Sequence, residues 1–265
     1  MSTPSPIVEV RDLHFSFGAR PVLNGVSFAV DAGEYVSIIG PNGAGKTTLI
    51  KCMNRILGGA RGEIRIAGRP LASYHQADLA RRVGYVPQAE GRHFGFTVFE
   101  FVLMARYPHL SPFSAITAAD EAAVRRALHL TGAEALADRI HGTLSGGERQ
   151  KVFIAAALAQ EGDILLLDEP TTFLDPHHQA DIFRILHRVN RESGVTVLAV
   201  THDINSAALA SSRILALKDG AVTYWGAPAA VMCNDVLRRI YDKDFLFAPH
   251  PVTGVPMLVP EGAAS

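Results

Sequence analysis

A glycine-rich segment between two regular stretches constrains this chain more than any other part of its sequence. Residues 35–40 form a compact apolar run, and residues 46–57 have the composition of a helix that ends at two glycines. The segment between them matches the pattern G-x-x-x-x-G-K-S/T. Its members are Gly40, Pro41, Asn42, Gly43, Ala44, Gly45, Lys46, Thr47 and Thr48.

This segment is predicted to be a loop that binds phosphate groups. Glycines allow a tight bend in which several N–H groups converge on phosphate oxygens, and the helix predicted over Lys46–Leu57 directs its positive end there. Lys46 would bridge the β- and γ-phosphates of a nucleotide, and the Thr47 hydroxyl would hold Mg²⁺. The alternative is a turn that only reverses the chain. The strand before the segment and the helix after it favour phosphate binding.

A second candidate site follows the apolar run 164–167, which ends in the adjacent acids Asp168 and Glu169. Carboxylates at the C-terminal edge of a parallel sheet face the crevice where ligands bind. Asp168 fits the acid associated with Mg²⁺, and Glu169 could act as a general base on an attacking water. Read alone, the pair is an ordinary strand end with two solvated acids. Beside a phosphate loop, the functional interpretation is favoured.

A third signal is Leu144-Ser145-Gly146-Gly147-Glu148. Ser145 and Glu148 have the spacing of a capping box at a helix start, and the two glycines would expose N–H groups at its positive end. One nucleotide does not need two separate phosphate-binding helix ends. We therefore expect this end to bind a nucleotide held by another subunit.

Composition excludes several classes. The 265 residues are 48% apolar and 19% charged, which is not the composition of a disordered chain. The formal net charge of −1 argues against electrostatic nucleic-acid binding. No apolar run approaches the roughly 18 residues that cross a bilayer. Two cysteines in no metal-ligand spacing indicate a reducing, cytoplasmic compartment.

Strand-like and helix-like segments alternate along the chain, which predicts an α/β fold with a mostly parallel sheet covered by helices. Two segments of helical spacing, at 97–106 and 117–130, interrupt this pattern and predict an inserted helical subdomain, and the second of them is rich in alanine. The other expected strands are 8–13, 22–30, 63–66, 83–86, 163–167, 195–200 and 213–217, and the other expected helices are 146–160, 177–192 and 204–211.

The order of these motifs resembles the ATP-binding subunit of an ABC transporter over nearly the whole chain. A narrower resemblance is to the importer ATPases for iron–siderophore, haem and cobalamin. It is carried by the segments 105–109, 171–179, 202–205 and 250–256. The resemblance implies one ABC ATPase domain over residues 1–265, with a P-loop NTPase core and an antiparallel β subdomain. The helical subdomain would cover about 89–160, the core 1–88 and 161–242, and the tail 243–265.

The resemblance also implies roles for further residues. Phe17 would stack on adenine, although a Phe in the core of a hairpin is the alternative. Gln88 would contact Mg²⁺ and the attacking water, and His202 would contact the γ-phosphate. In a dimer, the nucleotide held by one copy would also be bound by four residues of the other copy, Ser145, Gly146, Gly147 and Glu148. Leu174 and Asp175 would lie at the dimer interface.

The expected cofactors are ATP and Mg²⁺. The expected partners are a second copy of the chain, two copies of a polytopic membrane permease and, indirectly, an external substrate-binding protein, with no nucleic acid. The chain would lie peripherally on the cytoplasmic face of the membrane. Phenylalanines in the segment His93–Phe101 would form a groove for a partner helix or pack the helical subdomain. The pair His177-His178 favours a surface or interface role over a metal site.

Two positions depart from the family pattern, because Lys151 and Ala156 stand where Arg is commoner. These departures would change the packing or the salt bridges of the helix expected over 146–160. Other functions stay open. These are an exporter or oxyanion-importer ATPase, a soluble ABC ATPase that acts on DNA or ribosomes, and a P-loop kinase. A kinase would not need the LSGGE segment. The interval between the phosphate loop and LSGGE has no heptads, which argues against the ABC ATPases that act on DNA. The chain has one phosphate loop, which argues against those that act on ribosomes.

Overall fold

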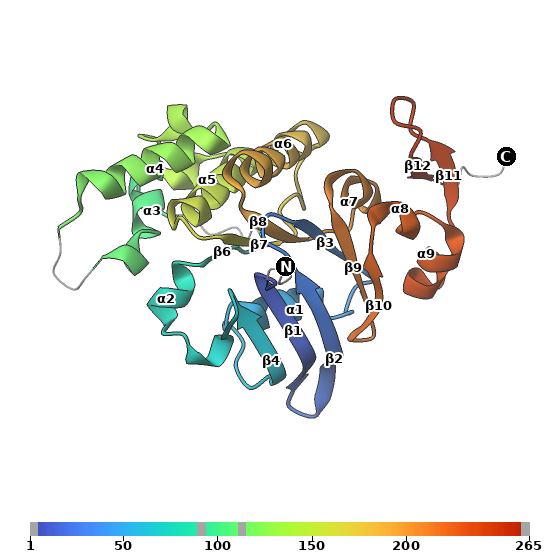
Figure 1. The fold of residues 1–265 in the computed structure, drawn as a ribbon. Coiled ribbons are helices and arrows are strands. Elements are labelled where there is room, and N and C mark those ends of the chain that lie inside the picture. Colours follow the sequence, from blue (N-terminus) through green and yellow to red (C-terminus); the bar gives the residue numbers. More distant parts are fainter. Residues whose placement is uncertain (1–4, 89–93, 111–114, 261–265) are drawn as a thin grey trace. The chain divides into compact units, whose positions relative to one another are not determined.

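The computed structural model describes residues 5–88, 94–110 and 115–260, which fold as two compact units (Figure 1). Of the described residues, the first unit contains 5–72 and 199–260, and the second contains 73–88, 94–110 and 115–198. Within the described residues, no helix is long and apolar enough to cross a membrane.

An antiparallel sheet opens the first unit. Its strands are β1 (Val8–Phe17), β2 (Arg20–Val30), β4 (Arg61–Ile66) and β5 (Arg69–Pro70), in the order β2-β1-β4-β5. Strand β1 is longer than the predicted 8–13. Its pairing with β2 shifts between Val10 and Leu13, where Asp12 has a φ of 46°. This irregularity interrupts the alternation of buried residues on which the prediction was based.

The first unit also holds strands β3 (Tyr35–Ile39), β9 (Arg213–Lys218) and β10 (Ala221–Gly226). β3 is parallel to β9, and β9 is antiparallel to β10. Its helices are α1 (Lys46–Met53), α7 (Ile204–Ala210), α8 (Pro228–Val231) and α9 (Asn234–Tyr241), and a terminal hairpin consists of β11 (Leu246–Pro249) and β12 (Pro256–Val259). All five residues of β3 are buried, as expected for a strand covered on both faces.

Helix α1 is shorter than the predicted 46–57 and ends at Met53. Arg55 adopts a left-handed conformation with a φ of 55°. Its N–H donates to the Cys52 carbonyl, and the N–H of Ile56 donates to the Lys51 carbonyl. These are the two hydrogen bonds of a Schellman motif, which terminates the helix before the two glycines that the prediction used as its end.

The second unit pairs β6 (Val83–Val86) in parallel with β7 (Ile164–Asp168). The strand β8 (Thr196–Val200) crosses the boundary between the units, and in the second unit Thr196 donates to the Asp163 carbonyl. The helices of the second unit are α2 (Gln76–Ala80), α3 (Val98–Met104), α4 (Ala118–Thr131), α5 (Gly146–Ala159) and α6 (Pro176–Ser193). Its 3₁₀ turns are η2 (Tyr107–His109), η3 (Glu134–Leu136) and η4 (His141–Thr143), whereas η1 (Leu71–Ser73) begins in the first unit and ends at the first residue of the second. The predicted α/β class, with parallel strand pairs, an antiparallel sheet and helices, is confirmed.

Three helices of the second unit start at capping boxes. Thr97 and Glu100 begin α3, Thr117 and Asp120 begin α4, and Ser145 and Glu148 begin α5. In each box the N-cap hydroxyl accepts from the N3 backbone N–H, and the N3 carboxylate accepts from the N-cap N–H. The helix starts therefore follow from local sequence. Apolar residues on the inner faces of α3, α4 and α5 then form one buried cluster.

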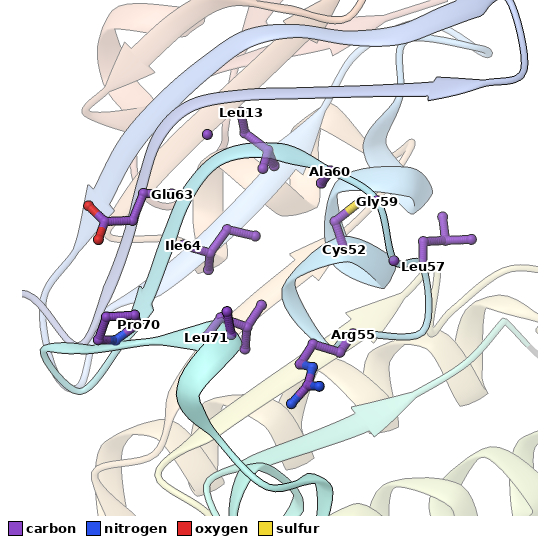
Figure 2. Close-up of a pocket in the computed structure, with 13 residues that line it drawn as sticks. Leu13, Cys52, Arg55, Leu57, Gly59, Ala60, Glu63, Ile64, Pro70 and Leu71 are labelled. Atoms are coloured by element: carbon purple, nitrogen blue, oxygen red, sulfur yellow. The ribbon is translucent and has the colours of Figure 1, made fainter.

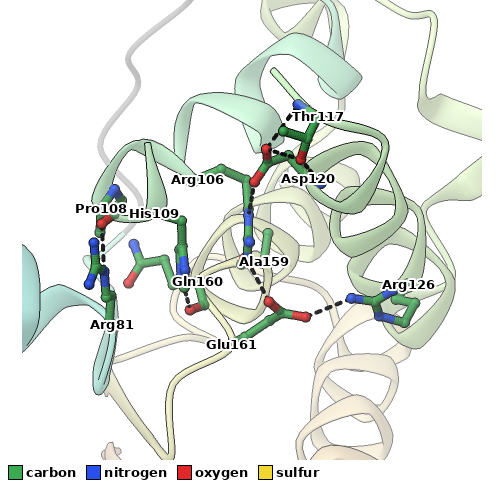
Figure 3. A network of polar contacts seen from close by, with 10 residues as sticks. All are labelled: Arg81, Arg106, Pro108, His109, Thr117, Asp120, Arg126, Ala159, Gln160 and Glu161. Carbon is green, nitrogen blue, oxygen red and sulfur yellow. Dashed lines mark hydrogen bonds and ion pairs between the residues drawn. The ribbon is translucent and has the colours of Figure 1, made fainter. Parts of the chain in front are cut away.

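A buried arginine joins the ends of these helices (Figure 3). Arg106, which follows α3, donates through Nε to Asp120 at 3.1 Å and through Nη1 to the Ala159 carbonyl at 2.7 Å. The same Nη1 lies 2.7 Å from a Glu161 carboxylate oxygen. Hydrogen bonds from Thr117, with a smaller contribution from Arg106, lower the pKa of Asp120 to about 2. Asp120 is therefore ionised at neutral pH and pairs with the buried cation.

Replacing this arginine is expected to destabilise the second unit. The variant Arg106→Met should lower the free energy of unfolding by about 3 kcal/mol, because one partner of a buried ion pair is removed and the Ala159 carbonyl loses its donor. Urea unfolding followed by circular dichroism measures the change. The matched control is Arg125→Met. Arg125 is exposed, lies over the Phe99 ring and pairs with Glu121 at 3.9 Å, so its loss should cost under about 1 kcal/mol. Equal losses in the two variants would contradict the role of Arg106.

Candidate functional site

The phosphate loop of the first unit connects β3 to α1, as predicted. Gly40, Gly43 and Gly45 have φ values of 142°, 80° and 96°, which side chains rarely adopt. A Cβ on Gly40 would lie 2.0 Å from the Leu217 carbonyl oxygen, and one on Gly45 would lie 2.8 Å from the Leu23 side chain. Neither glycine can be replaced without moving the neighbouring strand. The loop is a turn built on three glycines with positive φ values, two of which, Gly40 and Gly45, also have close neighbours.

Helix α1 begins at Lys46, and its N-cap residue is Gly45, which makes no side-chain cap hydrogen bond. No acidic residue lies in its first turn. Backbone N–H groups at such a helix end bind anions, and the helix dipole adds to this preference. The loop and the helix end therefore fit a phosphate group. Asn42 and Gly43 at the tip of the loop are exposed, whereas Ala44, Gly45 and Lys46 are buried.

Lys46 is 5% exposed, and its ammonium group contacts backbone oxygens of its own loop. Nζ donates to the carbonyl of Gly40 at 2.8 Å and to that of Pro41 at 2.9 Å. A buried ammonium needs such partners. These carbonyls place the charge inside the curve of the loop, where the β- and γ-phosphates are predicted to bind. Thr47 and Thr48 follow on the first turn of α1 and are half-buried.

Two other predicted nucleotide contacts lie in the first unit. Phe17 ends β1, is 53% exposed and packs edge-on against Phe15 with ring centroids 4.9 Å apart. It is not a core residue of the hairpin, and an exposed aromatic ring can stack on a base. His202 is exposed between β8 and α7. Asp203 caps α7 by accepting from the Ser206 N–H at 3.0 Å, which sets the position of the residue before it.

The acids of the second unit lie at the C-terminal end of β7, as predicted. Asp168 is 2% exposed, and Glu169 has a φ of 51° in the left-handed region. One Glu169 carboxylate oxygen accepts from Gln88 Nε2 at 3.0 Å and from the Thr172 hydroxyl at 3.1 Å. The structure thus brings together Gln88 and Glu169, both of which were predicted to act on the attacking water. Strained backbone at a candidate base is typical of functional sites.

The donor set expected for Mg²⁺ consists of hard oxygen ligands. The Thr47 hydroxyl of the first unit is an oxygen donor of this kind, and so are the Gln88 amide and the Asp168 carboxylate of the second unit. Among the described residues, no group of three or more His, Cys, Asp or Glu side chains could hold a metal on its own.

The LSGGE segment begins α5 through the Ser145–Glu148 box. Ser145 and Gly146 are exposed, and Arg139 donates to Glu148 at 2.8 Å. A hydrogen bond from the Ser145 N–H is the main reason that the pKa of Glu148 is lowered. The box uses the N–H groups of Ser145 and Glu148, and not those of Gly146 and Gly147. The exposed end of α5 is therefore a second helix end of the kind that binds anions.

Gly147 packs against a histidine that sequence analysis did not connect with it. A Cβ at Gly147 would lie 2.0 Å from His178 Cδ2. The His178 ring is fixed by Asp175, whose carboxylate contacts Nδ1 at 2.7 Å and accepts from the His178 N–H at 2.9 Å. A Cβ at Gly146 would contact Leu174 at 3.6 Å. Leu174 and Asp175, predicted at the dimer interface, thus lie beside the LSGGE segment.

The comparisons with known proteins agree with this geometry. The sequence profile of the ABC transporter family matches residues 23–172, which is more than half of the chain. The chain belongs to the ABC transporter family. Members of this family bind ATP and hydrolyse it to power transport, and this chain is an ATPase of that kind.

Curated relatives align over most of this ABC ATPase. The ferric enterobactin transport ATP-binding protein FepC of Escherichia coli (strain K12) is 39% identical over 95% of this chain and 93% of its own length. The hemin import ATP-binding protein HmuV of Streptomyces coelicolor is 39% identical over 94% of this chain and 88% of its own. A metal-chelate type ABC transporter in an inward-facing conformation matches with a TM-score of 0.84 and 26% identity, covering 97% and 98% of the two chains.

A dimeric ATP-binding cassette bound to ADP and phosphate, MJ0796, has a TM-score of 0.71 and 29% identity, and covers 83% of this chain and 98% of its own. The resemblance stated from the sequence is therefore confirmed at the family level, and the siderophore and haem relatives support the narrower one.

The phenylalanines of the segment His93–Phe101 have different environments, and His93 lies outside the described residues. Phe94 and Phe101 surround the buried His141, with ring centroids 5.3 and 4.6 Å from it. Phe99 packs on the helical cluster, whereas Phe96 is 48% exposed. For Phe94, Phe99 and Phe101 the packing alternative fits the structure, and Phe96 is available to a partner.

The two departures from the family pattern have simple environments. Lys151 pairs with Asp181 at 2.8 Å and connects α5 to α6. Ala156 packs against the helical cluster. Among the described residues, these contacts of Lys151 and Ala156 involve none of the predicted site residues.

One cavity of the first unit lies away from the predicted site (Figure 2). Its volume is about 290 Å³, and it is lined at the C-terminal end of α1, whereas the phosphate loop lies at the N-terminal end. Cys52 faces it, and burial raises the pKa of this thiol to about 11. The thiol is therefore protonated and unreactive at neutral pH. No predicted site residue lines this cavity.

The contact between Gly147 and His178 yields a prediction. The variant Gly147→Ala should lower the free energy of unfolding by about 2 kcal/mol, because the new methyl group overlaps the imidazole. The double variant Gly147→Ala/His178→Ala removes the overlap and should recover at least half of that loss. The measurement is a double-mutant cycle by urea unfolding. Additive losses would contradict the packing role of Gly147.

Proposed function

We propose that this chain is the ATP-binding subunit of an ABC importer for a metal chelate, such as an iron–siderophore complex, haem or cobalamin. The observation that carries the proposal is the presence of two separate helix ends of the kind that bind anions, the start of α1 after the glycine-rich loop and the exposed start of α5. A single nucleotide bound by one chain needs only one of them. The names of FepC and HmuV support the cargo class.

The first step is ATP binding. The phosphate loop, residues 40–48, would surround the phosphates with N–H groups, and Lys46 would exchange a carbonyl partner for the β- and γ-phosphates. Phe17 would stack on adenine. Mg²⁺, held by Thr47, Gln88 and Asp168, would neutralise charge on the phosphate oxygens when bound.

Two copies would then pair head to tail, so that each ATP also contacts the other copy's Ser145, Gly146, Gly147 and Glu148. Such pairing is isologous and gives two identical composite sites. The exposure of Ser145 and Gly146 supports this arrangement, as does the position of Leu174 beside Gly146. The dimeric cassette MJ0796 provides a structural parallel.

Hydrolysis follows in the closed pair. Glu169 would accept a proton from the attacking water, and its hydrogen bonds from Gln88 and Thr172 orient the carboxylate for this role. Lys46 and His202 would stabilise charge on the transferred phosphoryl group. Loss of the bridging phosphate would reopen the pair. Two copies of a polytopic permease, on whose cytoplasmic side the ATPase lies peripherally, would receive that motion, and an external binding protein would deliver the cargo.

The variant Glu169→Gln is expected to bind ATP but to hydrolyse it at least about 100-fold more slowly, because the general base is lost. With ATP and Mg²⁺ it should elute as a dimer on size-exclusion chromatography, whereas Lys46→Ala should stay monomeric under the same conditions. A monomeric Glu169→Gln protein with normal turnover would contradict the scheme.

The importer assignment is tested by affinity purification from detergent-solubilised membranes. We expect a polytopic membrane protein at equal stoichiometry, and transport of a radiolabelled ferric siderophore or haem when the pair is reconstituted with a binding protein. Recovery with ribosomes or nucleic acid would favour a soluble ABC ATPase. Export of a lipid or drug would favour an exporter.

A further inference from the structure

The segment after β10 packs onto the rest of the first unit through one apolar cluster. Val236, Leu237 and Ile240 of α9 are buried in this cluster, and Tyr241 and the terminal hairpin pack against it. The ring of Tyr241 lies edge-on to that of Phe245, with centroids 5.8 Å apart. The last residue of α9 is therefore fixed in position by packing.

The hydroxyl group of Tyr241 reaches the phosphate loop. It accepts a hydrogen bond from the N–H of Gly40, with a nitrogen–oxygen distance of 3.1 Å. Gly40 is buried, so its N–H requires a partner within the protein. The residue also lies against the Leu217 carbonyl, where a Cβ would approach to 2.0 Å. Gly40 is thus held on one side by β9 and on the other by Tyr241.

This contact is coupled to Lys46. The Gly40 carbonyl, on the same residue whose N–H donates to Tyr241, accepts from Lys46 Nζ at 2.8 Å. A rotation of the Gly40 backbone would move the carbonyl that holds the ammonium group. The Tyr241 hydroxyl restrains that rotation. The hydroxyl therefore acts on one of the two residues whose carbonyls hold the Lys46 ammonium group.

The terminal hairpin makes a second contact in the same unit. The Asn205 side chain donates to the Leu258 carbonyl at 3.0 Å and accepts from the Leu258 N–H at 2.7 Å. Asn205 lies on α7, which follows His202. The C-terminal segment therefore contacts the phosphate loop through Tyr241 and the helix after His202 through β12.

We propose that Tyr241 is a positioning residue for nucleotide binding, which fixes the Gly40 peptide and through it the phosphate loop and Lys46. The proposal rests on the ATP-binding role given above. Burial raises the pKa of Tyr241 to about 12, so the hydroxyl is neutral at any pH at which the ATPase would be assayed. Tyr241 touches no phosphate in this scheme and acts only through the loop.

The test is the variant Tyr241→Phe, which keeps the ring and removes the hydroxyl. The KM for ATP and the Kd for trinitrophenyl-ATP should rise roughly threefold to tenfold, the range expected for one hydrogen bond, while kcat changes less than about twofold. A KM change without a kcat change separates positioning of the loop from a general loss of folded protein.

Tyr224→Phe is the matched control. Tyr224 packs against the same cluster, and its hydroxyl donates to the Ala227 carbonyl at 2.7 Å rather than to the phosphate loop. We expect an unchanged KM for this variant. Both variants are assayed at a temperature where circular dichroism shows them folded, and amide exchange of residues 36–48 should accelerate only in Tyr241→Phe.

An unchanged KM and Kd in Tyr241→Phe would overturn the inference, as would equal shifts in the two variants. A wild-type chain that binds no trinitrophenyl-ATP would overturn the proposed ATP-binding role, and the inference with it. Normal wild-type binding with no effect of Tyr241→Phe would overturn the inference alone.

Discussion

The burial of the Lys46 ammonium group is the constraint on which the first unit depends. A cation with 5% exposure is stable only among oxygen atoms, and two carbonyls of its own loop supply them. This requires a chain that turns back on itself within six residues, which three glycines in the left-handed half of conformational space allow. The approach of the loop to the Leu217 carbonyl follows from the same turn. β3, α1 and β9 are thus arranged around one charge.

In the second unit, unfavourable backbone conformations lie close together after β7. Glu169 and Phe173 both have positive φ values, 51° and 65°, and neither is a glycine. The Phe173 ring is 87% exposed, so its own packing does not compensate the cost. Hydrogen bonds do so nearby, because Glu169 is held by Gln88 and Thr172 and the next helix is capped by Asp175. Such concentration of strain is typical of a segment that performs chemistry or contacts a partner.

Features determined by a few adjacent residues could be predicted from the sequence. The buried strand Tyr35–Ile39, the glycine-rich loop and the Ser145–Glu148 box are examples, because their causes lie within the segments themselves. The role of Gln88 was implied by the family resemblance, whereas its hydrogen bond to Glu169 joins residues that are distant in the sequence. The predicted end of α1 at Leu57 was wrong, because Arg55 adopts the left-handed conformation that glycine usually adopts and ends the helix at Met53. The contacts Gly147–His178 and Gly40–Tyr241 could not be predicted, because they join segments distant in sequence that only folding brings together.

The Arg106 network has a mechanical consequence. Arg106 connects the end of α3 to the start of α4 and to the last turn of α5, so these three helices turn together rather than slide past one another. The 14 residues of α5 are about 21 Å long, and Ser145 lies at the end opposite Ala159. A rotation of about 5° about the Ala159 end would carry Ser145 through nearly 2 Å at that length. A small rotation of α5 would therefore be amplified at Ser145, while the end that is held by Arg106 would hardly move.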